Sequence, residues 1–129
     1  MKFSPIDPPR EFQVAGGGQP VRLRDCARIS LEPDEQVTFT TPGGSEYDLA
    51  RKSWAYYATP SLNGRMKQFG LRPALVRSPA GRYYVLALES GQETDFHRYL
   101  AEERMEVVCW LDEEPALRMI GETFAHNRG

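Results

Sequence analysis

The residues best suited to binding chemistry are concentrated in the stretch WAYYATPSLNGR, residues 54–65. Its aromatic side chains directly precede Thr59-Pro60, a pair typical of a helix start. An aromatic wall beside the free N–H groups of a helix N-terminus suits a phosphorylated or carboxylated ring compound, such as a sugar or nucleotide. Arginines at both ends would supply positive charge. The predicted ligand-binding residues are Trp54, Tyr56, Tyr57, Ser61, Asn63, Arg65 and Arg51.

A structural interpretation of the same stretch stays open. Aromatic residues at a strand-to-helix junction commonly bury area between sheet and helix, and Ser61 and Asn63 can simply satisfy the helix start. If the alternation of residues 46–52 continues, Trp54 and Tyr56 share one face of the strand and Tyr57 takes the other. The three rings therefore cannot all enter one core.

A row of arginines, Arg22, Arg24 and Arg28, alternates along the predicted strand 21–31 and lies on one of its faces. Guanidinium groups bind phosphate and carboxylate through paired hydrogen bonds, so this face is a candidate anion-collecting surface. The alternative is an exposed face whose arginines pair with acids of neighbouring strands, such as Glu46 and Asp48.

Residue types for metal or nucleophilic chemistry are few. His97 and His126 are the only histidines, so a metal site would need mostly carboxylates. Cys26 and Cys109 are interpreted as small apolar fillers, although Cys26 lies between two arginines and is the better candidate for a reactive thiol. No phosphate-binding loop or dinucleotide fingerprint is present. We expect no metal and no cofactor.

Composition limits the class of protein. The chain has 129 residues, a net charge of −2 and a pI near 5.7, which argues against nucleic acid as a partner. It contains no secretory or membrane-length apolar segment, so we expect a soluble, cytoplasmic protein with no membrane contact. Three prolines mark residues 1–10 as an extended arm that packs across the surface or a neighbouring subunit, and residues 11–129 as a single domain.

The first half of the domain predicts an antiparallel β-meander. Apolar and polar residues alternate along most of its predicted strands, which is the pattern of a sheet with one buried face. A turn at 32–35 should join two strands as a hairpin, and a second turn follows at 42–45. The predicted strands are 11–15, followed by a glycine break at 16–18, then 21–31, 36–41 and 46–52.

The second half predicts a short helix followed by a ββαβ unit and a C-terminal helix. Thr59 should cap a helix from Pro60 to about Phe69, and a capping box at 90–93 should open the next helix, with Phe96, Tyr99 and Leu100 as core anchors. Strand 82–89 is apolar on both faces, so we expect it at the centre of the sheet. The remaining predicted elements are strand 71–77, a turn at 78–81, strand 105–112 and helix 113–126. The predicted fold class is α+β, a single layer-packed domain.

These observations favour a non-catalytic domain that binds a small anionic, sugar-like or nucleotide-like ligand. The alternative is a self-associating structural or regulatory protein-interaction domain, forming a homodimer or binding another protein through its arm and exposed aromatics. A second alternative is a small enzyme without a recognisable catalytic motif, using Asp48, Glu46 or His97. Whether the chain is an enzyme stays open at this stage, with the balance against it.

Overall fold

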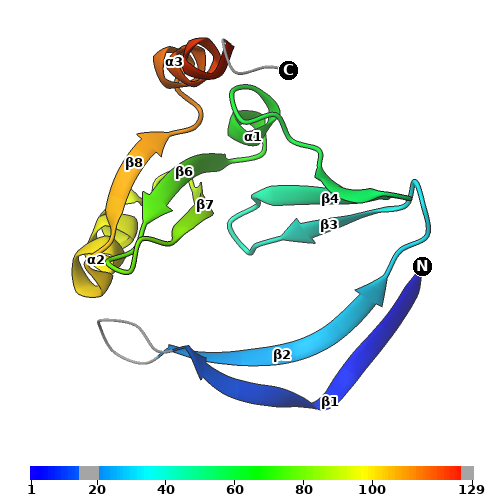
Figure 1. Cartoon of the computed structure of the whole chain (residues 1–129). Coiled ribbons are helices and arrows are strands. Elements are labelled where there is room, and N and C mark those ends of the chain that lie inside the picture. Colours follow the sequence, from blue (N-terminus) through cyan, green and yellow to red (C-terminus); the bar gives the residue numbers. More distant parts are fainter. Residues whose placement is uncertain (15–20, 126–129) are drawn as a thin grey trace. The chain divides into compact units, whose positions relative to one another are not determined.

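A computed structural model of the chain describes residues 1–14 and 21–125 (Figure 1). These residues contain eight strands and three helices, and every strand pair with an assigned register is antiparallel. The predicted α+β class is therefore confirmed. The predicted glycine break at 16–18 lies outside the described residues. The chain divides into two compact units, Met1–Phe39 with Asp48–Thr59, and Thr40–Tyr47 with Pro60–Gly129.

The first unit contains a long two-stranded ribbon made of β1 (Lys2–Val14) and β2 (Val21–Ser30). The sequence suggested an arm over residues 1–10 that is separate from a strand at 11–15, but the structure joins both into β1. The prolines fit because β1 pairs with β2 along one edge only, where missing N–H donors are tolerated. The pairing register shifts between Pro5 and Arg10, where Pro8 and Pro9 interrupt the ladder.

The next three strands form a separate sheet in the order β3 (Gln36–Thr40), β4 (Glu46–Lys52) and β5 (Ala55–Ala58), and most of their residues belong to the first unit. The predicted hairpin between strands 21–31 and 36–41 is wrong, although the turn between them forms. Asp34 has a positive φ of 68°, and its N–H donates to the carbonyl of Arg51 at 2.7 Å. The turn is therefore bonded to β4 and does not close a ladder between β2 and β3.

The second unit is built on a three-stranded sheet in the order β7 (Tyr83–Glu89), β6 (Leu71–Arg77) and β8 (Glu106–Trp110). The ββαβ arrangement is confirmed, but the central strand is β6 and not the predicted 82–89. Both faces of β6 carry buried residues, whereas β7 lies at an edge and exposes Tyr83, Tyr84 and Val85. An apolar pattern on both faces predicts a strand of low polarity, but it does not distinguish a central strand from an edge strand.

The core of this unit lies between the sheet and helix α2 (Glu93–Glu103). Phe96 and Leu100 pack against Ala74 and Val76 of β6, and all four are buried. Tyr99 is exposed, so its predicted role as a third anchor is wrong.

The predicted capping box at 90–93 does not form. Gly91 has a φ of 93°, which lies outside the helical range, and the N–H of Gln92 donates to the carbonyl of Glu89 in a turn. Helix α2 therefore has Gln92 as its N-cap in place of Ser90 and begins at Glu93, two residues later than expected.

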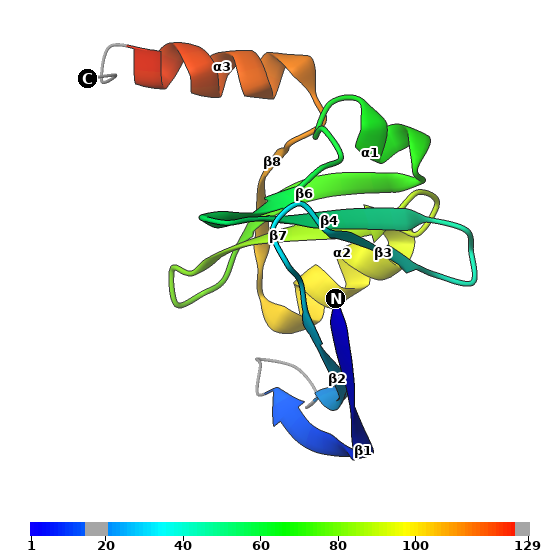
Figure 2. The same cartoon turned by 90° about the vertical axis from the view of Figure 1, so that its right-hand side faces the viewer.

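The connection after β8 is anchored by an ion pair. Arg72 of β6 binds Asp112 through Nε at 2.9 Å, and its guanidinium lies 4.0 Å from the ring centre of Trp110. The hydrogen bond to Asp112 raises the pKa of Arg72. The predicted C-terminal helix follows as α3 (Glu114–Ala125), which continues the chain after β8 in Figure 2 and contains no buried residue.

Glu89 at the end of β7 holds the turn between β3 and β4. Its carboxylate accepts hydrogen bonds from the hydroxyl of Thr41 and from that of Ser45 at 2.7 Å. These two bonds lower the pKa of Glu89 below its ordinary value of 4.5. The ionised form is thus favoured in the folded chain.

We predict that Glu89 contributes a pH-dependent part of the free energy of unfolding. Because folding lowers its pKa, the contribution is present above pH 4.5 and is lost as the pH falls through the folded pKa. Urea unfolding of the wild type and Glu89→Gln should therefore differ at neutral pH and converge in acid. Glu102→Gln, an exposed change, is the control. A difference that stays constant with pH would contradict the assignment.

Candidate functional site

The seven residues predicted to bind a ligand are divided between the two units. Arg51 and the three aromatic residues belong to the first unit. Ser61, Asn63 and Arg65 belong to the second. Each group is therefore a surface feature of its own unit.

The aromatic group lies on the hairpin formed by β4 and β5. Arg51 pairs with Tyr56 across this hairpin, and Trp54 lies in the turn between the strands. The predicted continuation of the strand phase through Trp54 is wrong, because the chain reverses there. The exposed fractions are 83% for Trp54, 76% for Tyr56 and 54% for Tyr57. Rings this exposed are not a buried seam between sheet and helix.

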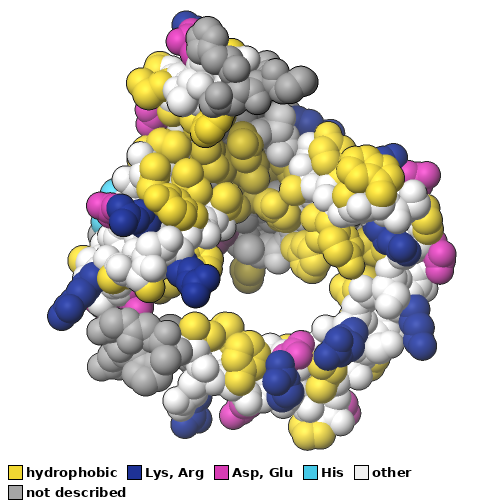
Figure 3. All heavy atoms as spheres, in the orientation of Figure 1, with side chains coloured by type: hydrophobic (Ala, Val, Ile, Leu, Met, Phe, Trp, Pro, Cys, Tyr) yellow, Lys and Arg dark blue, Asp and Glu magenta, His cyan; other side chains and the backbone are white. Residues whose placement is uncertain are grey.

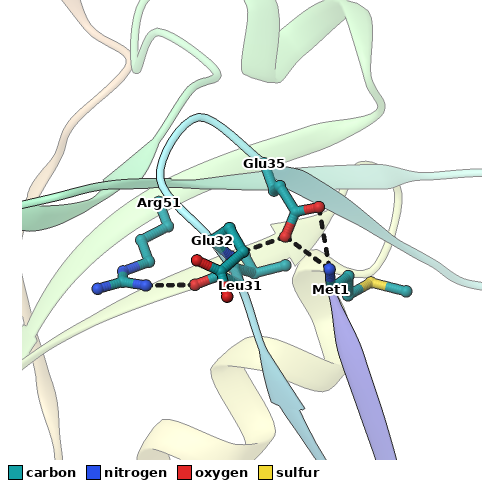
Figure 4. Close-up of polar contacts among 5 residues, drawn as sticks. All are labelled: Met1, Leu31, Glu32, Glu35 and Arg51. Carbon is teal, nitrogen blue, oxygen red and sulfur yellow. Dashed lines mark hydrogen bonds and ion pairs between the residues drawn. The ribbon is translucent and has the colours of Figure 1, made fainter.

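The cations beside these aromatics already have partners within the first unit, and Figure 4 shows the contact of Arg51 with Leu31. Arg51 donates from its guanidinium to the carbonyl of Leu31 at 2.5 Å. Lys52 binds Asp34 at 2.7 Å, and this hydrogen bond raises the pKa of Lys52. Both positive charges therefore hold the turn after β2, which reduces their value as ligands for an anion.

The same turn is also bonded to the start of β1. A carboxylate oxygen of Glu35 accepts from the Met1 ammonium at 3.0 Å, and the other accepts from the N–H of Glu32 at 2.7 Å. The ammonium is the main reason that the pKa of Glu35 lies below its ordinary value, and the N–H of Glu32 adds to the effect. The carboxylate of Glu35 thus links the start of β1 to the turn after β2, through the ion pair with Met1 and the hydrogen bond from the backbone N–H of Glu32.

Ser61, Asn63 and Arg65 precede or begin helix α1 (Arg65–Gln68), which is much shorter than the predicted helix from Pro60. Asn63 and Gly64 disfavour helix, so residues 62–64 form a turn instead. A helix of four residues has too few aligned peptide units for a useful N-terminal dipole. The predicted helix start at Pro60 is therefore wrong, and the anion cradle that depended on it loses this support.

The polar groups around α1 have internal partners as well. The Ser61 hydroxyl accepts from the N–H of Arg65 at 2.8 Å, and Asn63 donates to Glu114 at 2.7 Å. The guanidinium of Arg65 lies 5.1 Å from the ring centre of Phe69. These contacts fix the turn against the rest of its unit.

The arginine row lies on the polar face of the ribbon. Arg24 stands opposite Glu11 of β1, Arg28 opposite Ser4 and Arg22 opposite Gln13. The predicted pairing with Glu46 or Asp48 is wrong, because the strand beside β2 is β1. Asp48 is buried and accepts from the hydroxyl of Thr38 at 2.6 Å.

The opposite face of the ribbon is an apolar surface that the sequence revealed only in part. Three apolar pairs face each other across the strands: Phe3 with Ile29, Pro5 with Ala27, and Phe12 with Leu23. The larger of these side chains are exposed, and Figure 3 shows hydrophobic atoms on the surface of the ribbon. We call these six residues the apolar ribbon face. Alternation of residues 21–31 predicted half of it, but the prolines concealed the partner strand.

An ion pair interrupts the apolar ribbon face at its middle. Arg10 stands opposite Asp25, and their side chains approach to 3.4 Å. Asp25 breaks the apolar phase of its strand in the sequence, and the structure supplies its counter-charge.

Other candidate groups remain dispersed. Within residues 1–14 and 21–125, no three histidine, cysteine or acidic side chains gather as a metal site. Cys26 is exposed, Cys109 is partly buried and His97 lies beside the Phe96 ring. His126 falls outside the residues that the structure describes. No helix in the described part of the chain is long and apolar enough to span a membrane.

Comparison with known proteins gives no relative. No family model, curated protein or solved structure matches this chain.

We predict that Arg51 acts as a structural group. Arg51→Leu leaves the Leu31 carbonyl without its donor and should lower the free energy of unfolding by about 1 kcal/mol. Lys52→Leu is the matched control, because it removes only an exposed ion pair and should lower the free energy of unfolding less than Arg51→Leu does. Urea unfolding measures both. Equal effects of the two substitutions would contradict this role.

Proposed function

We propose that this chain is a self-associating protein-interaction domain whose partner surface is the apolar ribbon face. The observation that carries the proposal is the exposure of that face: Phe3 is 58% exposed and Leu23 is 44% exposed, although both belong to a regular strand pair. Contiguous exposed apolar surface on one side of a sheet is typical of an interaction site.

The architecture of the ribbon supports this proposal. A two-stranded sheet is marginally stable by itself in water, and sheets gain stability when an apolar face is covered. The polar face carries the arginine row and suits water. The apolar face suits a partner of similar polarity, and a second copy of this chain offers the same surface.

We predict a concentration-dependent dimer that depends on Phe12. Phe12→Ser removes a large apolar side chain from the face, next to the Arg10–Asp25 pair, and should shift the sedimentation profile toward monomer, with a dissociation constant raised about tenfold. Gln13→Ser is the matched control, because Gln13 is the next residue and lies on the polar face.

The control should assemble like the wild type. Circular dichroism checks that both variants keep their strands, and Leu23→Ser provides a second test of the same face. Reducing agent is present throughout, since Cys26 is exposed. Wild-type protein that remains monomeric up to millimolar concentration would contradict the proposal.

A second candidate function is binding of a sugar-like or nucleotide-like ring compound on the β4–β5 hairpin. Its support is the exposure of Trp54 and Tyr56, since aromatic faces stack on such rings. The internal partners of Arg51 and Lys52 make an anionic group a weaker requirement than the sequence suggested.

We predict that a ring ligand, if this candidate holds, quenches or shifts the fluorescence of Trp54. The other tryptophan, Trp110, lies against Arg72 and serves as an internal reference in a Trp54→Phe variant. Titration with sugars, phosphosugars and nucleotides should change the signal of the wild type only. No change across this panel would exclude the hairpin as a ring-binding site. The cytoplasmic location, the absence of a nucleic-acid partner and the non-enzymatic character stay predictions from the sequence.

A further inference from the structure

We propose that two copies of the chain stack their apolar ribbon faces with a two-fold axis parallel to the strands, so that Arg10 of each copy meets Asp25 of the other. This inference rests on the proposed function and specifies the partner and the orientation. The juxtaposition that carries it is the pair of opposite charges in the middle of an otherwise apolar face.

The register keeps this face continuous. On β2, Leu23, Asp25 and Ala27 are spaced by two residues and share one face. On β1, Pro5 stands opposite Ala27 and Arg10 opposite Asp25, so five residues of β1 pass while β2 advances by two. Plain alternation over five residues would reverse the faces of β1, but the irregular segment between Pro5 and Arg10 absorbs the extra residues and leaves Arg10 paired with Asp25. Apolar pairs therefore lie on either side of the Arg10–Asp25 pair.

The charges choose between the two symmetric ways of stacking such ribbons. If the two-fold axis runs across the strands at the level of the charge pair, each strand covers its own copy, and Arg10 would face Arg10 of the second copy. If the axis runs along the strands, β1 covers β2, and Arg10 faces Asp25 of the second copy. The second arrangement replaces like-charge contact by attraction. Arg10 can reach outward, because its side chain is 67% exposed.

The size of the face sets the expected strength. A strand of 13 residues spans about 43 Å, and two strands with their side chains are about 10 Å wide. The projected area is about 400 Å² for each copy, against about 800 Å² in a typical stable interface. We therefore expect a weak, reversible dimer that forms at high protein concentration.

Charge reversal across two chains tests the contact. Arg10→Asp and Asp25→Arg should each weaken the homodimer about tenfold, because each variant places like charges opposite one another. An equimolar mixture should restore affinity to near the wild-type value as a heterodimer. Repulsion within each chain persists in the mixture, so restoration reports a contact between chains. Sedimentation equilibrium and native mass spectrometry of differently tagged variants provide the measurements.

Cross-linking tests the orientation. With the axis along the strands, residue 12 of one copy lies over residue 23 of the other. Stacked sheets lie about 10 Å apart, which is too far for a disulfide but within reach of a short bismaleimide. In a Cys26→Ser background, Phe12→Cys mixed with Leu23→Cys should cross-link as a heterodimer. Phe12→Cys mixed with Ile29→Cys is the out-of-register control.

The outcomes separate this inference from the proposed function. Suppose that Phe12→Ser weakens the wild-type dimer, but that the charge reversals have no effect or that mixing them does not restore affinity. This result overturns the stacking geometry and still supports self-association. Preferential cross-linking of the out-of-register pair does the same. A wild-type monomer at all concentrations overturns both. Weakening by each reversal, restoration in the mixture and cross-linking at residues 12 and 23 support the inference.

Discussion

A two-stranded sheet has no interior, and this constraint governs the first unit. Backbone hydrogen bonds between β1 and β2 satisfy one edge of each strand, but they cover neither face. Alternation then sorts the side chains into a face with three arginines and a face with Phe3, Phe12, Leu23 and Ile29. The second unit obeys the opposite rule, because α2 covers its sheet and buries Phe96 and Leu100. One unit completes its core internally, and the other presents apolar surface.

Three charged residues of the first unit hold the turn that follows β2. Arg51, Lys52 and Glu35 all bind the turn that follows β2 or its immediate flanks. This use of charge explains why the β4–β5 hairpin is aromatic without being cationic. Trp54 and Tyr56 remain available for contact, but an anion near them would compete with bonds that the fold already makes. Ring stacking or protein contact therefore suits the hairpin better than anion binding.

Sequence patterns predicted local structure better than pairing. The turn at Pro33-Asp34, the alternation of β2 and the burial of Phe96 and Leu100 follow from short-range preferences, and the structure confirms them. Period-two alternation predicts which side chains share a face, but it does not predict which strand lies next to which. The sequence therefore predicts that β2 pairs with β3, whereas it pairs with β1. The extent of β1 was concealed by its prolines, which a strand with one free edge tolerates.

The sequence also did not predict the lengths of the helices or the geometry of the candidate site. Local signals at Thr59-Pro60 and Ser90 predicted helix starts, but Asn63-Gly64 and the positive φ of Gly91 delay both helices. The prediction of ligand-binding residues depends on residue type and on proximity in the sequence. Neither property reports whether a polar group already has a partner, and Arg51, Ser61 and Asn63 all do.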